Sequence, residues 1–587
     1  MEDQINLKDL FKTDKDFEKE LKSLEKEVKK IISYEGHILE NPENLYNFLS
    51  FDTLISKRLE RLYLYAHINN DLDLTNQKYQ DYLGKVLNLA NNISEKSSFV
   101  LPELLTKDFS DILKMIKKYP KLKEYKNNLK DIYRNKKLIK NKDEEKIISI
   151  LTSTYDKPED ISEFLLTTDL DYGFIIDENG KKNKLTLSNF STYLESNNGN
   201  VRKDAFEGIY KNIKAFENTF NAIFTSKIME NNKLSKIRGF DSARKLSLYQ
   251  NNIKNNIYDK LIEGIHKNLN KFYKYYDFKK EVLNIKDFHI YDTYANITSN
   301  FNKDFSLEEA KNIIISSLSI LGNDYIDIIK KSFSDNWISY YPKKNKRDGG
   351  YCTCAYLAHP YIVINYENKL EDVSTLAHEL GHAMHYYYAK ENNTYEDYNY
   401  SIFVAEVASQ VNEIILTDYL LNNADNIEEK KYLLDSILKR FKATMIRQTM
   451  FAEFEDILHT KENKGIILTK DVVQNTYYDL NKLYFGENVI IDDYIKYECY
   501  RIPHFYYNFY VYQYATGYAA ALKIAHDIIN KKAGALEKYR KFLTLGSTLD
   551  PVKSLAVAGV DMLDDKLYDE VFTYFDNYLK ELKKLYE

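Results

Sequence analysis

The sequence predicts a mostly α-helical protein with two short β elements. The 587-residue chain contains only 18 Gly and 8 Pro, about 4% of the chain against roughly 12% in average proteins. Because turn residues are so scarce, long helices are favoured over an all-β or loop-rich fold. Hydrophobic residues make up 44% and aromatic residues 14% of the chain, so a large core can form and wholesale disorder is excluded.

Charge and cysteine content narrow the class of protein. The chain has 83 Lys and Arg against 88 Asp and Glu, a net charge of −5, which offers no positive footprint for nucleic acid. Residues 114–142 carry twelve basic and two acidic residues, and a solvated helix surface accounts for them. Three Cys are too few for a disulfide framework, and no signal peptide is recognised at the N-terminus. We therefore expect a cytoplasmic protein.

The pattern of the N-terminal third predicts amphipathic helices followed by a hairpin. Between residues 15 and 30 the apolar side chains recur at helical spacing, and this character continues to about residue 165. Two short runs, 172–176 and 184–187, flank Asn179-Gly180, which is a hairpin turn signal. The polar turn cluster at 196–200 is the best candidate boundary. We predict an N-terminal helical region over 1–195, with the hairpin near 172–187, and a second domain over 196–587.

A second β element is expected just before the most informative motif. Residues 351–356 and 361–366 are β-favouring runs separated by Leu-Ala-His-Pro, which predicts another hairpin.

One uncharged stretch is long enough to be considered as a membrane-spanning helix. Residues 502–522 contain no formal charge and are long enough to cross a bilayer. They also contain His504, Asn508, Gln513 and six Tyr, whose polar groups would need partners in hydrocarbon. A helix that lines a wet internal cavity is favoured, and no membrane association is expected.

The sequence His378-Glu379-Leu-Gly-His382 is an H-E-x-x-H motif, which is typical of zinc peptidases. Side chains at i and i+4 of a helix lie about 6 Å apart on one face, so both imidazoles can converge on one ion. Glu379 lies beside them and can reach water next to the metal without being a ligand.

The residues around this motif predict a long amphipathic helix. Asn368 and Glu371 form an N-cap and N3 pair that can start a helix at Lys369. The apolar residues that follow gather on the face opposite His378 and His382. One face therefore packs, and the other presents ligands to a cavity.

A catalytic zinc needs a third protein ligand and one open position. Glu406 is preferred, because it lies among apolar residues where an unpaired carboxylate would be costly. His385 lies about 10 Å along the helix from His378, too far to share one ion easily. Glu391 and Glu396 are weaker alternatives, and Glu413 is suited to orienting a ligand His.

A tyrosine-rich segment lies downstream of these residues. Pro503 suits the first turn of a helix, which would place His504 and Tyr507 on one face. Such groups can donate hydrogen bonds to a developing oxyanion. Aromatic packing explains them equally well, since the chain has 52 Tyr.

At this point the sequence resembles oligoendopeptidase F, in the thimet oligopeptidase family of zinc metallopeptidases. The resemblance covers residues 200–580 well and the N-terminal helices only in general character. Its blocks are His378-Glu-Leu-Gly-His-Ala-Met-His, Phe403-Val-Ala-Glu-Val-Ala-Ser, Arg347-Asp-Gly-Gly-Tyr-Cys, Tyr361-Ile-Val-Ile-Asn-Tyr, Arg447-Gln-Thr-Met-Phe-Ala-Glu-Phe-Glu455, Ile502-Pro-His-Phe-Tyr and Gly546-Ser-Thr-Leu-Asp-Pro551.

The resemblance implies a two-lobed helical body with a deep central channel and cleavage of short peptides inside the cell. It implies one zinc ion held by the residues that match the family's ligands, His378, His382 and Glu406. Glu379 matches the catalytic base, and His504 matches the substrate-facing His. The functional Tyr is Tyr507 by helical phase or Tyr512 by its Tyr-x-Tyr match.

Taken together, the sequence predicts a zinc endopeptidase that acts on oligopeptides as a monomer or small homo-oligomer. The strand that ends at Tyr356 is expected to pair with the backbone of the peptide. A zinc carboxypeptidase or dipeptidase of related fold is the alternative, and a non-enzymatic helical binding scaffold is a more distant one.

Overall fold

The computed structural model describes residues 5–152, 154–155, 157–298 and 303–587. It divides into two compact units, each built from three stretches of the chain. Unit 1 comprises Met1–Lys136, Asn302–Leu420 and Ile524–Val560, and unit 2 comprises Lys137–Phe301, Leu421–Lys523 and Asp561–Glu587. Residue 196 falls inside the first stretch of unit 2, and the domain division expected there stays a prediction.

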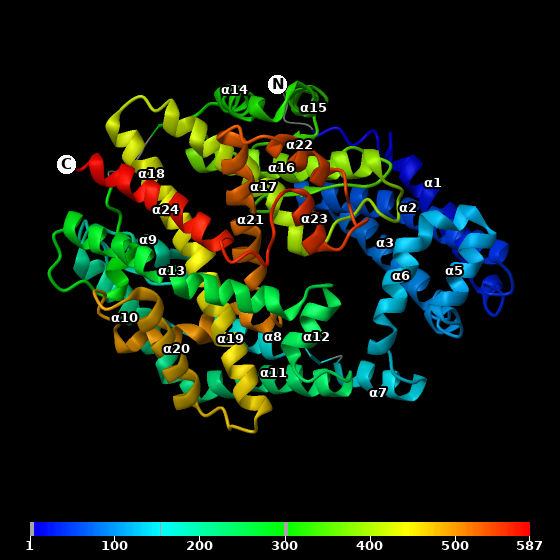
Figure 1. Ribbon diagram of the computed structural model, residues 1–587, viewed down its shortest axis with the longest axis horizontal. Coiled ribbons are helices and arrows are strands. Elements are labelled where there is room, and N and C mark those ends of the chain that lie inside the picture. Colours follow the sequence, from blue (N-terminus) through cyan, green and yellow to red (C-terminus); the bar gives the residue numbers. More distant parts are fainter. Residues whose placement is uncertain (1–4, 153, 156, 299–302) are drawn as a thin grey trace. The chain divides into compact units, whose positions relative to one another are not determined.

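The mostly helical fold is confirmed, and the strands are few and short (Figure 1). The helices of unit 1 are α1 (Asp14–Val28), α2 (Pro42–Leu72), α3 (Gln77–Lys96), α4 (Val100–Leu104), α5 (Phe109–Lys118), α6 (Lys126–Arg134), α14 (Leu307–Leu318), α15 (Asn323–Ser334), α16 (Leu370–Asn392), α17 (Ile402–Asn422), α22 (Ala535–Leu543) and α23 (Pro551–Val557). Those of unit 2 are α7 (Lys142–Thr152), α8 (Lys157–Phe164), α9 (Leu187–Leu194), α10 (Gly199–Ala215), α11 (Glu217–Ile237), α12 (Ala243–Gln250), α13 (Asn255–Val282), α18 (Ile427–Phe441), α19 (Arg447–Asn463), α20 (Lys470–Phe485) and α24 (Leu567–Lys584). Helix α21 (Tyr512–Ile529) is divided between the units at Lys523, and the last two residues of α17 follow Leu420 and belong to unit 2.

The hairpin predicted near 172–187 is present in unit 2. Strand β1 (Phe174–Ile176) pairs antiparallel with β2 (Lys182–Lys184). Gly180 closes the turn with φ +76°, a conformation that glycine adopts without the steric cost of a side chain.

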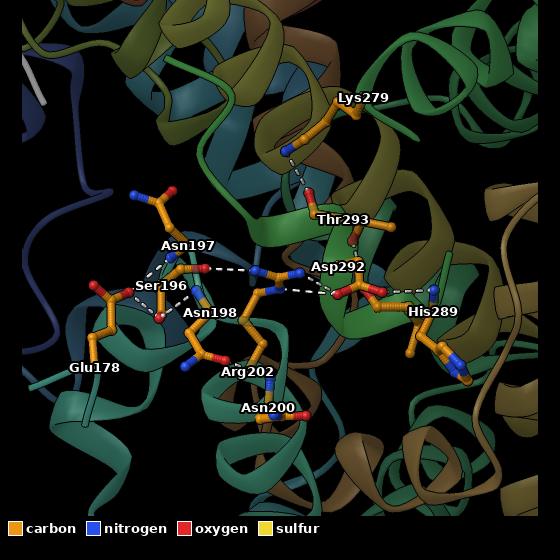
Figure 2. A network of polar contacts seen from close by, with 11 residues as sticks. Glu178, Ser196, Asn197, Asn198, Asn200, Arg202, Lys279, His289, Asp292 and Thr293 are labelled. Carbon is orange, nitrogen blue, oxygen red and sulfur yellow. Dashed lines mark hydrogen bonds and ion pairs between the residues drawn. The ribbon is translucent and has the colours of Figure 1, made fainter. Parts of the chain in front are cut away.

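The polar cluster at 196–200 is an ordered helix start, as Figure 2 shows. The Asn198 side chain caps α10, and the Glu178 carboxylate accepts from the Asn197 amide at 2.8 Å. Arg202 of α10 reaches back to the Ser196 carbonyl at 2.7 Å and forms a buried ion pair with Asp292 at 2.6 Å. These contacts tie the segment into unit 2.

The second predicted hairpin is also present, within a three-stranded sheet of unit 1. Strand β4 (Tyr351–Thr353) pairs antiparallel with β5 (Tyr361–Val363), and β3 (Ile338–Ser339) pairs parallel with the other side of β5. The sheet order β3-β5-β4 leaves β4 at an edge. Strand β3 was not predicted, because two residues carry no period that a sequence can reveal.

The apolar core of α1, α2 and α3 extends to this sheet. Phe17, Leu62 and Tyr82 belong to the same buried cluster as Tyr361 and Val363 of β5. Helix α16 contacts β4 and β5 and packs on α14, α15 and α22. The sheet and the motif helix are therefore fixed to each other within unit 1.

Two local expectations need correction. Helix α16 starts one residue later than predicted, with Lys369 as N-cap, because Asn368 takes a left-handed φ of +67° and Asp372 accepts the Lys369 amide at 2.9 Å. Residues 502–522 are not one helix, since Asn508 and Phe509 have positive φ and α21 begins only at Tyr512. No helix within the described residues is long and apolar enough to cross a membrane.

Candidate metal centre

Helices α16 and α17 bring three predicted side chains to one point in unit 1. The Nε2 atoms of His378 and His382 lie 3.2 Å apart, and Glu406 Oε2 lies 3.3 and 3.4 Å from them. Three ligands of a tetrahedral zinc at 2.0–2.1 Å would lie about 3.3–3.4 Å from one another. In the described part of the chain, this is the one group of three His, Cys or carboxylate residues found with spacing suited to a metal ion. The donor set and its spacing therefore fit zinc.

A glycine allows the two helices to come this close. A Cβ on Gly381 would lie 2.5 Å from Ser409 Cα and 2.7 Å from the Ala408 carbonyl oxygen. Gly381 lies between Glu379 and His382 in the motif, so the contact of α16 with α17 occurs at the level of the two imidazoles. The side-chain amide of Asn412 in α17 also donates to the Ala377 carbonyl of α16 at 3.1 Å.

A second carboxylate of α17 orients His378. Glu413 Oε1 lies 2.6 Å from His378 Nδ1, and Glu413 Oε2 accepts from Ser374 at 3.1 Å. This contact directs the Nε2 atom of His378 towards Glu406 and raises the basicity of the ring. The arrangement agrees with the role that the sequence analysis gave Glu413.

The charges of the cluster stabilise one another. Burial lowers the pKa of His378, but hydrogen bonds to Glu406 and Glu413 raise it to about 10. Burial raises the pKa of Glu406, but hydrogen bonds to both His hold it well below its usual range. The centre therefore holds carboxylate charge that a cation at this position would balance.

Glu379 lies in the same centre and is 6% exposed. Burial raises its pKa, while the charges of His378 and His382 lower it. Its Oε1 lies 3.7 Å from the place that a Cβ on Gly350 would take, so it lies close to the start of β4.

The centre remains open to solvent. The side chains of His378, His382 and Glu406 are 24%, 15% and 39% exposed. Solvent access is what a catalytic zinc site needs, since one position must admit water or substrate.

The weaker ligand candidates lie elsewhere. His385 is 1% exposed. Its ring stacks on the Tyr400 ring, with the ring centres 3.7 Å apart, and it also contacts the Phe542 ring. Glu396 accepts from Thr53 at 2.5 Å, and Glu391 lies 3.7 Å from Lys390. None of these three residues belongs to the group formed by His378, His382 and Glu406.

His504, Tyr507 and Tyr512 lie in unit 2, where His504 and Tyr507 are neighbours and Tyr512 lies in the core. The rings of His504 and Tyr507 are 5.6 Å apart, and Tyr507 is 46% exposed. Tyr512 is fully buried with its ring 5.1 Å from that of Tyr258.

Two tyrosines that the sequence analysis did not select join His504. The Tyr514 hydroxyl lies 3.4 Å from His504 Nε2, and the Tyr510 ring lies 6.4 Å from the His504 ring. No helical spacing marked this pair in the sequence, because Tyr510 precedes the start of α21 at Tyr512.

Comparison with known proteins decides the family. The sequence profile of "Peptidase family M3" matches residues 192–573, and that of "Oligopeptidase F" matches residues 103–172. The chain belongs to peptidase family M3. The family resemblance stated from the motifs is thereby confirmed, and the protein is a metallopeptidase rather than a binding scaffold.

M3 relatives cover the whole chain. It is 35% identical over 584 residues to oligopeptidase PepF of Bacillus subtilis, covering 100% of this chain and 87% of that protein. It is 36% identical over 587 residues to an oligoendopeptidase F homolog of Borreliella burgdorferi, covering 100% and 98%. The crystal structure of oligoendopeptidase-F from Enterococcus faecium has a TM-score of 0.75 at 31% identity, covering 97% of this chain and 99% of that one.

Proposed function

We propose that this M3 peptidase is a cytoplasmic endopeptidase that hydrolyses internal bonds of oligopeptides with one zinc ion held by His378, His382 and Glu406. The observation that carries the proposal is the spacing of 3.2–3.4 Å among the three ligand atoms. The names of the relatives, oligopeptidase and oligoendopeptidase, support the substrate class. The three cysteines are free, which suits a reducing compartment.

Glu379 is the proposed general base. When bound, zinc supplies Lewis acidity that acidifies water and polarises a carbonyl group. Glu379 lies on the turn between the two His, and it takes the proton of the attacking water and returns it to the leaving amine. Glu413 holds His378 in place by the 2.6 Å contact to its Nδ1.

The open edge of β4 is the proposed site for the peptide backbone. The amides of Ile362 and Ile364 donate towards β3, at 3.0 and 2.9 Å, so the backbone groups of Tyr361 and Val363 face β4. In the observed register these residues pair with Thr353 and Tyr351. The amide and carbonyl of Cys352 therefore point to the open edge, where an added strand can bond to them whatever its side chains are.

His504 and Tyr507 are the proposed donors to the oxyanion. Burial lowers the pKa of His504, so at neutral pH the ring is uncharged and keeps one N–H to donate. Tyr507 is preferred to Tyr512, because its ring is partly exposed whereas that of Tyr512 is buried. Tyr514 is placed to orient His504.

The test combines a metal analysis with a peptide series. We expect about one zinc per chain, and internal cuts in unstructured oligopeptides, with a folded protein left intact. Mass spectrometry of the products separates internal cuts from the sequential loss of terminal residues. Loss of terminal residues alone would favour the carboxypeptidase alternative, and a zinc-free active enzyme would overturn the metal assignment.

A further inference from the structure

Helix α2 of unit 1 presents two carboxylates along β4. Glu60 and Asp71 are eleven residues apart, which on a helix is about 16 Å and about 20° of rotation, so they share one face. Glu60 contacts Tyr356 and Asp71 contacts Tyr351. Strand β4 ends at Thr353 and Tyr356 lies in the turn that follows it, so the two carboxylates contact the two ends of the segment that contains β4.

Asp71 holds the beginning of β4. Its side chain is fully buried, and its Oδ2 accepts from the Tyr351 hydroxyl at 3.0 Å. Arg347 Nη1 lies 3.2 and 3.3 Å from the two carboxylate oxygens, and the Arg347 amide donates to the Asp71 carbonyl at 2.8 Å. His67, one turn earlier in α2, lies 3.2 Å from the same carboxylate.

Glu60 holds the end of the segment that contains β4. Its Oε2 accepts from the Tyr356 amide at 2.8 Å, and its Oε1 accepts from the Tyr398 hydroxyl. Burial raises the pKa of Glu60, and these two hydrogen bonds lower it. A backbone amide and a tyrosine hydroxyl are both donors, so each contact favours the carboxylate form.

The segment held at Asp71 passes directly beside Glu379. A Cβ on Gly350 would lie 3.1 Å from Ile364, 3.4 Å from Thr375 and 3.7 Å from Glu379 Oε1. There is little free space at this point, so a shift of Tyr351 changes the distance between the Cys352 backbone and the proposed base. The side-chain amide of Asn365 donates to the carbonyls of Arg347 and Gly349 and so also holds the chain just before β4.

We propose that Asp71 and Glu60 are positioning residues that fix the open edge of β4 beside Glu379 and thereby set how well an extended peptide is held for hydrolysis. The inference rests on the proposed pairing of the peptide with Cys352. Neither carboxylate touches the peptide or the metal; each acts through the strand. Their loss therefore weakens recognition of the peptide backbone and leaves the metal in place.

The test measures whether a protein variant and a change in the substrate have independent effects on kcat/KM, as in a double-mutant cycle. The variant Asp71→Asn removes the charge but keeps the shape, and Asp81→Asn is the matched control, since Asp81 is an exposed α3 residue paired with Lys85. The substrate is a quenched fluorescent nonapeptide, together with a series in which each non-scissile amide in turn is replaced by an ester. An ester removes one backbone donor with little change in shape.

We expect one ester position to lower kcat/KM of the wild-type enzyme about tenfold, the effect of one lost hydrogen bond. Asp71→Asn should lower kcat/KM of the all-amide peptide about tenfold, mainly through KM, and reduce the ester effect to about twofold. Zinc content should stay unchanged, and Asp81→Asn should behave as wild type. A purely structural role would lower the melting temperature but leave the ester effect intact.

The experiment distinguishes a failure of the proposed strand pairing from a failure of the positioning role. If no ester position affects the wild type, the strand pairing in the proposed function is wrong. If an ester effect is present but Asp71→Asn leaves it intact, the positioning role is wrong. Should Asp71→Asn not fold, Tyr351→Phe removes one hydrogen bond to Asp71, and Glu60→Gln weakens the other end. A reduced ester effect in either variant supports the role, and an intact effect in both overturns it.

Discussion

The Cα of Ser409 lies 2.5 Å from the position that a Cβ on Gly381 would occupy. This contact joins α16 to α17 at the level of the two motif His, and it sets how closely Glu406 approaches them. Gly381 is thus required for helix spacing and not for backbone flexibility.

We expect Gly381→Ala to force α16 and α17 apart, with a loss of about 1–3 kcal/mol in unfolding free energy and weaker zinc binding. Gly84→Ala is the matched control, because Gly84 lies in α3 and its Cβ would meet no atom within 4 Å. That control should gain up to about 1 kcal/mol, since Ala favours helix. Chemical denaturation and chelator competition measure both effects. Equal behaviour of the two variants would contradict the close-contact argument.

Removing the proposed base should separate chemistry from metal binding. Glu379→Gln keeps the shape of the side chain but cannot take a proton, so kcat should fall by about 10²–10⁴-fold or more. Zinc measured by mass spectrometry should remain at about one per chain. Activity close to that of the wild type would refute the base assignment.

The third ligand can be tested by a pair of variants. Glu406→Ala should lose zinc and activity together, because two His alone hold the ion weakly. His385→Ala should keep zinc, although removing a buried ring costs about 2–5 kcal/mol of stability. The assignment is wrong if the His385 variant loses the metal and the Glu406 variant retains it.

The contact between Glu413 and His378 should contribute to metal affinity. Glu413→Gln should weaken zinc binding about 10–100-fold, because the ring loses its orienting carboxylate. The exposed Glu391→Gln is the control and should not change the affinity. Competition with a fluorescent chelator gives both dissociation constants, and equal values would remove Glu413 from the site.

A buried carboxyl in unit 2 should make stability depend on pH. Burial raises the pKa of Glu455 to about 8, and a hydrogen bond from the Phe509 amide opposes this. Since the folded pKa exceeds the unfolded value, the folded state keeps a proton that the unfolded state loses between pH of about 4.5 and 8. Unfolding free energy therefore falls as pH rises through this range and levels off above it.

Glu455→Gln should remove that fall, because Gln is neutral at every pH. The variant should match the wild type near pH 4 and exceed it near pH 9, as measured by urea unfolding at a series of pH values. A wild-type curve that does not fall between these limits would show that Glu455 is ionised in the folded protein.

The short-range features of this protein were determined by its sequence. Helical period and scarce turn residues predicted the fold class, Asn179-Gly180 predicted the first hairpin, and the spacing of His378 and His382 placed two imidazoles on one helix face. Glu406 was found because a carboxylate among apolar residues needs a partner. Each of these signals depends on neighbours in the chain, which is why a single sequence reveals them.

Only the tertiary structure decided the long-range relationships. The distance from Glu406 to the two His depends on the contact of Gly381 with Ser409, and the position of β4 depends on Asp71 and Glu60, which precede it by about 290 residues. The burial of Tyr512 and the solvent exposure of Tyr507 also result from packing. Contacts between residues far apart in the chain leave no periodic trace in the sequence, because their partners are selected by how whole elements pack.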